Sequence, residues 1–396
     1  MPLDRNDTRP LCAIYVAWHP TFDLGADIAK RLYQHFRRDL FTNVAGGVGL
    51  SVLYRSAPTS DRPLSVSFDD SHVAVVFLLL SEAMAIDSGW RGYVNDLLAG
   101  AAARGLRARV IPVCTDRYGL SMIGDINAVR YDEWSEQPEP RAVRLISTLT
   151  HELCRILRTY IASNNYPGVA VEQLDAYLEK VCVFLSHSKH DPYGEKIAVA
   201  LRQFLSDNSA LSQFFDVRDI PAGLPFPTVL EHYVQKSAVV AIYTDSYSSR
   251  EWCRREIIEA KRADRPLVIA DCIEEIDERS FPYLGNVPVV RMEPTAMERI
   301  PNVVARLLDE VFKDYLWSAR LSHDGRTSDA SVRYLPRTPE LIALSGLRVA
   351  AGGTPPTIVY PDPPLGAEEL QLFHDVRSDL ILMPYSEYAA VKGGAP

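Results

Sequence analysis

Apolar runs alternate with stretches of helical spacing along the first part of the chain. Runs typical of buried strands lie at 12–17, 50–54, 73–80 and 107–113. Apolar residues recur every three to four positions, as in Ile28, Leu32 and Phe36, within predicted helices at 24–38, 89–103 and 141–162. Pro167 and Gly168 mark a break after the last of these helices. Strands alternating with helices predict a parallel sheet covered on both faces.

The second part of the chain repeats this pattern. Strands are predicted at 181–185, 214–217, 238–244, 267–270 and 288–291, and helices at 194–205, 228–236, 251–263 and 300–313. When Ala13 is aligned without a gap on Cys182, Gly25 falls on Gly194 and the pair Ile-Ala recurs. The shared positions favour an internal duplication, with chance similarity of a common strand–helix pattern as the alternative.

The last part of the chain differs in composition. Residues 319–340 are rich in polar residues and prolines, which is typical of a linker. A strand at 357–360, a helix at 368–376 and a strand at 379–383 form a small α/β segment of unknown role. One such unit cannot bury its own faces, so it docks on the rest, pairs with another chain or belongs to a longer protein. The predicted division is 1–166, 167–318, 319–340 and 341–396.

Composition narrows the class of protein. With 396 residues and a net charge of -9, the chain does not resemble a protein that binds nucleic acid through a basic surface. Its apolar runs are too short to cross a membrane, and its N-terminus lacks an apolar signal segment. The six cysteines form no CxxC pair, which favours reduced thiols in the cytoplasm.

Several common active-site motifs are absent from the sequence. It contains no HExxH, no phosphate-binding GxxxxGK[ST], no GxGxxG after a strand and no GxSxG. Gly46-Gly47-Val48-Gly49 precedes a strand instead of linking a strand to a helix, which favours a flexible turn. No metal site and no cofactor are expected.

Three polar blocks in the second part could form a ligand site. Ser186 and Lys189 follow the first strand, where ligands bind in doubly wound sheets. The alternative, which this feature alone favours, is a solvated loop with Asp191 as the helix cap. A long loop over 215–226 follows the second strand. In the third block Trp252 and Glu256 are four positions apart and share a helix face. The alternative is a core Trp252 with Glu256 in an ion pair.

Together the blocks VFLSHSKHD, FFDVRDIPAGLPF and SYSSREWCRREI resemble the Toll/interleukin-1 receptor (TIR) domain over about residues 179–317. The resemblance implies a five-stranded, flavodoxin-like parallel sheet. Many bacterial, plant and axonal members cleave NAD at the nicotinamide glycosidic bond, using the glutamate of a W-x-x-x-E helix. This role transfers to Glu256, with Trp252 beside it.

The resemblance also implies how NAD, a substrate and not a cofactor, would be held. Its phosphates need cations and donors, and the expected substrate-binding residues are Trp252, Ser186, Lys189, Asp216, Arg218, Phe226 and Tyr247. A carboxylate at Glu256 would stabilise the oxocarbenium-like ribose. The product, ADP-ribose or a cyclic isomer, stays open.

The first part fits the same fold without the chemistry. Val94 stands four residues after Trp90, where the catalytic carboxylate would be, and Asp96 points elsewhere on the helix. The loop at 18–23 lacks the polar cluster of the second part. We therefore expect tandem flavodoxin-like α/β domains, the first a degenerate TIR-like domain that regulates, senses or assembles.

The predicted function is a cytoplasmic NAD-cleaving enzyme, in a bacterial immune system, that self-association through TIR domains activates. A partner protein or nucleotide signal could act through the N-terminal domain or the C-terminal segment, and neither membrane nor nucleic acid is an expected partner. The alternatives are a non-catalytic TIR adaptor and another nucleotide N-glycosidase or transferase.

Overall fold

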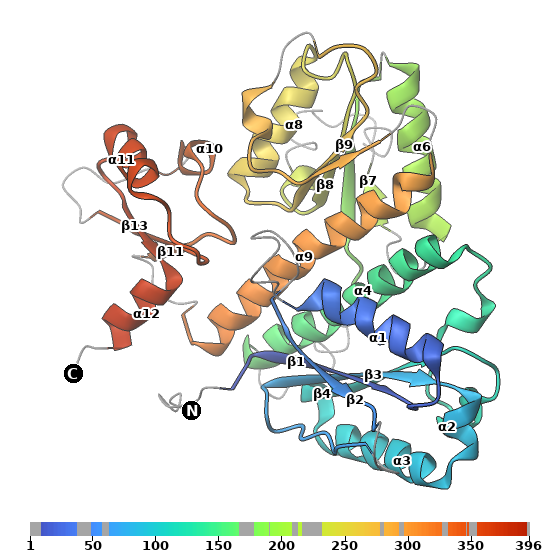
Figure 1. The fold of residues 1–396 in the computed structure, drawn as a ribbon. Coiled ribbons are helices and arrows are strands. Elements are labelled where there is room, and N and C mark those ends of the chain that lie inside the picture. Colours follow the sequence, from blue (N-terminus) through green and yellow to red (C-terminus); the bar gives the residue numbers. More distant parts are fainter. Residues whose placement is uncertain are drawn as a thin grey trace. The chain divides into compact units, whose positions relative to one another are not determined.

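The computed structural model describes residues 9–37, 49–57, 63–165, 178–189, 191–207, 213–215, 232–277, 281–292, 297–326, 332–345, 347 and 355–393. The chain forms two compact units, Met1–Tyr177 and Leu178–Pro396 (Figure 1). The division therefore falls later than the expected boundary after residue 166, and the C-terminal segment belongs to the second unit.

A five-stranded parallel sheet forms the first unit. Its strands are β1 (Cys12–Trp18), β2 (Ser51–Arg55), β3 (Val73–Leu80), β4 (Ala108–Cys114) and β5 (Val129–Arg130), in the order β2-β1-β3-β4-β5. Its helices are α1 (Asp23–Phe36), α2 (Glu82–Ile86), α3 (Ser88–Ala103) and α4 (Pro138–Asn165), with short 3-10 turns at Gly105–Arg107, Gly119–Met122 and Tyr131–Glu133. Every residue of β1 and β3 is buried, as expected of strands covered on both faces.

Local signals explain how α3 begins and packs. The Asp87 carboxylate accepts hydrogen bonds from the backbone N–H groups of Gly89 and Trp90, which caps the helix. Trp90, Val94 and neighbouring apolar residues of α3 are buried against the sheet. The Trp that opens this helix is therefore a core residue of the first unit.

The second unit contains another five-stranded parallel sheet. Its strands are β6 (Cys182–Ser186), β7 (Gln213–Phe215), β8 (Ala238–Tyr243), β9 (Leu267–Asp271) and β10 (Val289–Arg291), in the order β10-β9-β8-β6-β7. Its helices are α6 (Pro192–Asp207), α8 (Glu251–Arg262) and α9 (Ile300–His323), with 3-10 turns at Pro282–Leu284 and Met297–Arg299. The predicted helix at 228–236 falls mainly outside the described residues.

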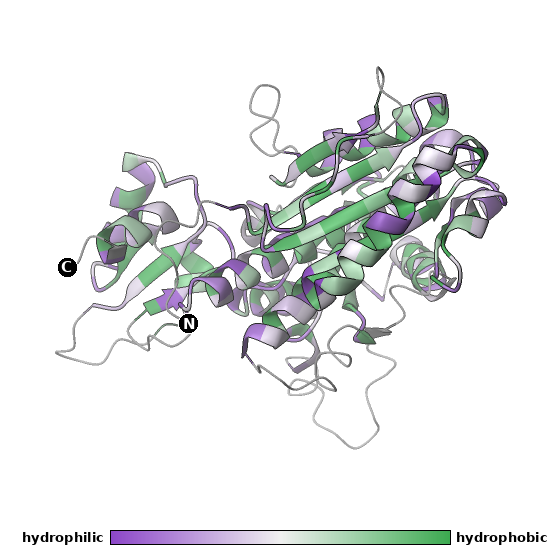
Figure 2. Cartoon of the chain, turned by 90° about the horizontal axis from the view of Figure 1, so that it is seen from below, coloured by the Kyte–Doolittle hydropathy of each residue, from purple (hydrophilic) through white to green (hydrophobic). Residues whose placement is uncertain are grey.

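Both sheets have the same topology. Counted along each unit, the strands lie in the order 2-1-3-4-5, which is the flavodoxin-like doubly wound arrangement. Figure 2 shows the strands as mainly hydrophobic elements between amphipathic helices. The predicted α/β class, with two flavodoxin-like domains in tandem, is confirmed.

The C-terminal segment is larger than the sequence predicts. It contains β11 (Val332–Tyr334), α10 (Leu341–Ser345), β12 (Thr357–Tyr360), α11 (Ala367–Val376), β13 (Ile381–Pro384) and α12 (Tyr385–Gly393), with a parallel sheet ordered β11-β12-β13. Residues 319–340 are thus not a simple linker, because they hold the end of α9 and strand β11. Their polar composition does not predict this structure, since Ala319, Leu321 and Leu335 are the only buried residues among A, V, I, L, M, F, W, Y and C that the structure describes in this stretch.

The C-terminal segment docks on the rest of the second unit. Leu321 of α9 belongs to the same apolar cluster as Val359, Tyr385 and Tyr388. Charged contacts add to this packing, and they pair Lys261 with Glu340 (2.6 Å), Arg333 with Asp264 (3.1 Å) and Arg337 with Asp314 (2.6 Å). The sequence left open whether the C-terminal segment docks on the rest of the chain, pairs with another chain or belongs to a longer protein. The structure shows that it docks on the rest of the second unit.

Candidate functional site

The candidate site lies where the central strands of the second unit end. Ser186 is the last residue of β6 and pairs in register with Ala241 of β8. Tyr247 follows β8, and Glu256 lies in the second turn of α8. This is the carboxyl edge of a doubly wound sheet, where such folds bind ligands.

Three predicted site residues meet there in one hydrogen-bonded cluster. The hydroxyls of Ser186 and Tyr247 are 2.5 Å apart, and the Ser186 hydroxyl also bonds to the Glu256 carboxylate. The side chains are buried, with relative exposures of 1% for Ser186, 0% for Tyr247 and 4% for Glu256. A serine hydroxyl has one proton to donate. If Glu256 is ionised, its carboxylate accepts the hydrogen bond from Ser186, and the Tyr247 hydroxyl then donates a hydrogen bond to the Ser186 oxygen.

Burial keeps the neighbouring titratable groups protonated. The pKa of Tyr247 is raised well above its ordinary value, first by desolvation and then by electrostatic interaction with the neighbouring acidic groups of Cys253 and Glu256. Desolvation, with Glu256 as the next cause, raises the pKa of Cys253 to about 12. Tyr247 therefore remains a hydrogen-bond donor at neutral pH.

Two acidic residues, which no motif in the sequence singles out, fix the loops around this cluster. The Asp277 carboxylate accepts hydrogen bonds from Tyr243 (2.5 Å) and Ser248 (2.9 Å), and the Tyr243 ring lies 5.3 Å from that of Tyr247. Asp245 accepts from three successive backbone N–H groups at 274–276. The loop after β8 is thereby tied to the loop after β9.

The loop after β6 has a structural explanation. Asp191 accepts hydrogen bonds from the backbone N–H groups of Tyr193 (3.0 Å) and Gly194 (3.2 Å) at the start of α6. Its capping role, one of the two readings open from the sequence, is confirmed. Lys189 is exposed beside it, and Ser186 contacts Glu256 and Tyr247 instead of facing outward as a phosphate ligand would.

Trp252 lies apart from the buried cluster in this structure. Its side chain is 41% exposed, and the Arg255 guanidinium lies 4.7 Å from its ring centroid. Spacing by four residues places Trp252 and Glu256 on one side of α8, but the Trp252 side chain in the first turn is exposed, whereas Glu256 in the second turn is buried. The alternative of a core Trp252 is wrong.

Three predicted substrate-binding residues cannot be placed. Asp216, Arg218 and Phe226 lie outside the described residues. Their roles stay predictions that rest on the TIR resemblance alone.

The equivalent positions of the first unit are all apolar. Ala17 pairs with Leu78 as Ser186 pairs with Ala241, and Met84 lies as far beyond Leu78 as Tyr247 lies beyond Ala241. Val94 follows Trp90 by the spacing that separates Glu256 from Trp252. Ala17, Met84 and Val94 share one buried apolar cluster. The two units thus share the same strand order, and at these described positions the acid–hydroxyl cluster of the second unit is replaced by apolar side chains in the first.

The described residues contain no group of His, Cys, Asp and Glu able to hold a metal ion, and the described helices include none long and apolar enough to cross a bilayer. None of the six cysteines forms a disulfide.

Fold and site together define the second unit as a flavodoxin-like domain with a buried carboxylate at the carboxyl edge of its sheet. Residues 183–299 match the family model of the TIR domain, which supports the resemblance noted from the sequence. No curated protein matches the chain significantly. Among solved structures, the C-terminal domain of glucosamine-fructose-6-phosphate aminotransferase from Francisella tularensis is 10% identical, with 80% of this chain and 85% of that chain covered and a TM-score of 0.19.

Proposed function

We propose that the second unit cleaves NAD at the nicotinamide–ribose bond, with Glu256 as the catalytic carboxylate. The observation behind this proposal is the Tyr247–Ser186–Glu256 cluster at the carboxyl edge of the sheet. The fold itself does not require this polar cluster. In the first unit, which has the same strand order, the apolar side chains of Ala17, Met84 and Val94 occupy the equivalent positions.

The cluster suits a reaction that develops positive charge on a sugar. Nicotinamide leaves as a neutral molecule, so the departing group needs little acid assistance. The ribose becomes oxocarbenium-like, and a fixed carboxylate stabilises that charge more in the transition state than in the substrate. Ser186 would hold the Glu256 carboxylate in one orientation, and Tyr247 would hold Ser186.

Burial of Glu256 bears on how the enzyme is activated. A carboxylate that is 4% exposed must become accessible before it can meet a ribose. TIR domains commonly self-associate, and we propose that assembly opens the site, as expected of an immune effector or signal generator. Water as acceptor would give ADP-ribose, and the adenine of the same molecule would give a cyclic isomer.

Replacement of Glu256 by glutamine tests the proposal. Glu256→Gln keeps the size of the side chain and removes its charge, so nicotinamide release should fall by about 10²- to 10³-fold while NAD binding persists. Glu251→Gln is the matched control, since Glu251 is exposed in the first turn of the same helix. Both variants are compared with wild type at equal folding and oligomeric state. A Glu256→Gln enzyme within about threefold of wild type contradicts the assignment.

A second candidate is a non-catalytic TIR adaptor. The closed position of Glu256 favours it, because a buried, hydrogen-bonded carboxylate can simply fix α8 against β6. Mass spectrometry after incubation with NAD, NADP and deoxynucleosides, with and without forced oligomerisation, separates the candidates. An adaptor leaves all of these compounds intact. Another N-glycosidase or transferase would cleave NADP or a deoxynucleoside instead of NAD.

A further inference from the structure

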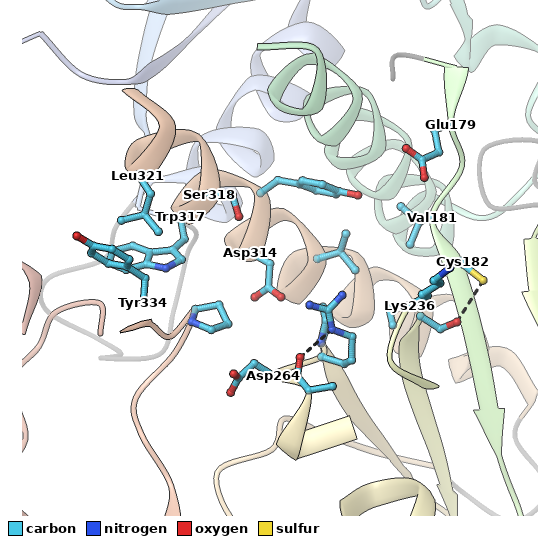
Figure 3. Close-up of a pocket in the computed structure, with 18 of the residues that line it drawn as sticks. Glu179, Val181, Cys182, Lys236, Asp264, Asp314, Trp317, Ser318, Leu321 and Tyr334 are labelled. Carbon is cyan, nitrogen blue, oxygen red and sulfur yellow. Dashed lines mark hydrogen bonds between the residues drawn. The ribbon is translucent and has the colours of Figure 1, made fainter. Parts of the chain in front are cut away.

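A cavity of about 440 Å³ lies within the second unit, at the edge of the sheet opposite Glu256. Its walls are the amino ends of β6, β8 and β9, the second half of α9, and the C-terminal segment through Arg333 and Tyr334. In Figure 3, Asp314, Trp317 and Ser318 project from α9 on one side, and Cys182 lies on the facing strand. The volume is within the range of about 300–1,000 Å³ typical of small-molecule sites.

The two acidic side chains deep in this cavity are already paired. Asp264 is bonded to Arg333 at 3.1 Å and Asp314 to Arg337 at 2.6 Å. Burial raises the pKa of both carboxyl groups, that of Asp314 to about 6. Neither acid therefore offers an unpaired negative charge to a ligand.

Two cationic groups in the same lining remain available. The Arg265 side chain donates one hydrogen bond, from Nε to the carbonyl of Ala263 at 3.0 Å, and its charge also counteracts the raised pKa of Asp264 and Asp314. Within the part of the chain that the structure describes, neither its terminal nitrogens nor the Lys236 ammonium has a hydrogen-bond partner. Glu179 and Lys180 add one charge of each sign. The cavity thus has an excess of positive charge and of hydrogen-bond donors, which suits an anion.

Aromatic side chains give the cavity a second chemical feature. Tyr315, Trp317 and Tyr334 line it together with the cations. Flat aromatic rings pack well on such side chains, whereas inorganic anions gain nothing from them. We propose that the cavity binds a phosphate-bearing aromatic molecule of mononucleotide size, with Lys236 and Arg265 on the phosphate.

The ligand would connect two parts of the unit. Lys236 and Arg265 precede β8 and β9, whereas Tyr334 belongs to strand β11 of the C-terminal segment. Occupancy therefore stabilises the docked position of that segment. The inference goes beyond NAD cleavage and concerns the opposite edge of the sheet, so a catalytically inactive protein can still bind the ligand.

Calorimetric titration of the full chain with AMP tests the proposal, with inorganic phosphate and adenosine as separate arms. AMP should bind more tightly than either. Lys236→Glu and Arg265→Glu should each weaken AMP binding by at least about tenfold, the effect of losing one charge-assisted hydrogen bond. Lys196→Glu, which reverses an exposed lysine of α6 outside the cavity, should leave the affinity unchanged. Addition of AMP should slow backbone amide hydrogen exchange at β11 and in the second half of α9.

Two results would overturn the proposal. They are no AMP binding at millimolar concentration, and losses of AMP affinity with Lys196→Glu equal to those with Lys236→Glu and Arg265→Glu, which would show that AMP does not bind in this cavity. If Arg265→Glu fails to fold, Arg265→Gln and Lys236→Gln decide the question, because each removes the positive charge without introducing a negative one. If the protein does not cleave NAD, this test still applies, because it measures the binding of AMP and not turnover.

Discussion

Ser186→Ala is the sharpest test of the buried cluster. The hydroxyl of Ser186 bonds to both Glu256 and Tyr247, whose side chains are buried. Its removal takes a charge-assisted hydrogen bond from Glu256, about 1.5–3 kcal/mol, and leaves the Tyr247 hydroxyl without this acceptor, about 1–3 kcal/mol. Direct contact between Tyr247 and Glu256 would recover part of the loss. We expect the second unit to lose about 2–4 kcal/mol of unfolding free energy.

The assay is urea unfolding of the full chain, in which the transition of the second unit should shift. Ala17→Ser is the reciprocal control, because it places a hydroxyl in the apolar cluster with Met84 and Val94. It should lower the free energy of unfolding of the first unit by about 1–3 kcal/mol. A loss under about 1 kcal/mol for Ser186→Ala would show that the cluster is not a coupled network.

The remaining predictions concern buried charges. Burial raises the pKa of Asp314 to about 6, so the folded state binds its proton more tightly than the unfolded state, and the stability that this contributes is lost as pH rises from about 4 through 6. Asp314→Asn should lack that loss, with a difference of at most about 3 kcal/mol between the two pH-dependent denaturation curves. Lys261→Met removes the ion-pair partner of Glu340 and should lower the free energy of unfolding of the second unit by about 1–3 kcal/mol. Proteolysis of the C-terminal segment should become faster, and a rate equal to that of the wild type would contradict a docking role for this ion pair. Val94→Glu should cost the first unit about 3–5 kcal/mol in thermal unfolding, because its site lacks the hydroxyls that surround Glu256, and a smaller loss would contradict the comparison of the two units.

The hydrophobic pattern alone predicted much of the fold. Val73–Leu80 is an unbroken apolar run, and it is a fully buried central strand of a parallel sheet. The repeated strand–helix order predicted the two doubly wound units, and the spacing of three polar blocks pointed to the TIR family. Hydrophobic periodicity and the order of motifs along the chain can be read from the sequence without knowing which segments come into contact.

Tertiary structure alone decided which polar groups meet and where the C-terminal segment docks. Ser186 lies 61 residues from Tyr247 and 70 from Glu256, and only the strand order brings their side chains together. Trp252 and Glu256 share a helical spacing, yet one is exposed and the other buried, because burial depends on the elements packed against α8. Strand β11 has little apolar pattern of its own. Pairing with β12 and the hydrogen bond from Arg333 to Asp264 hold it in place. Periodicity describes one segment at a time, whereas hydrogen bonds between distant segments depend on the whole fold.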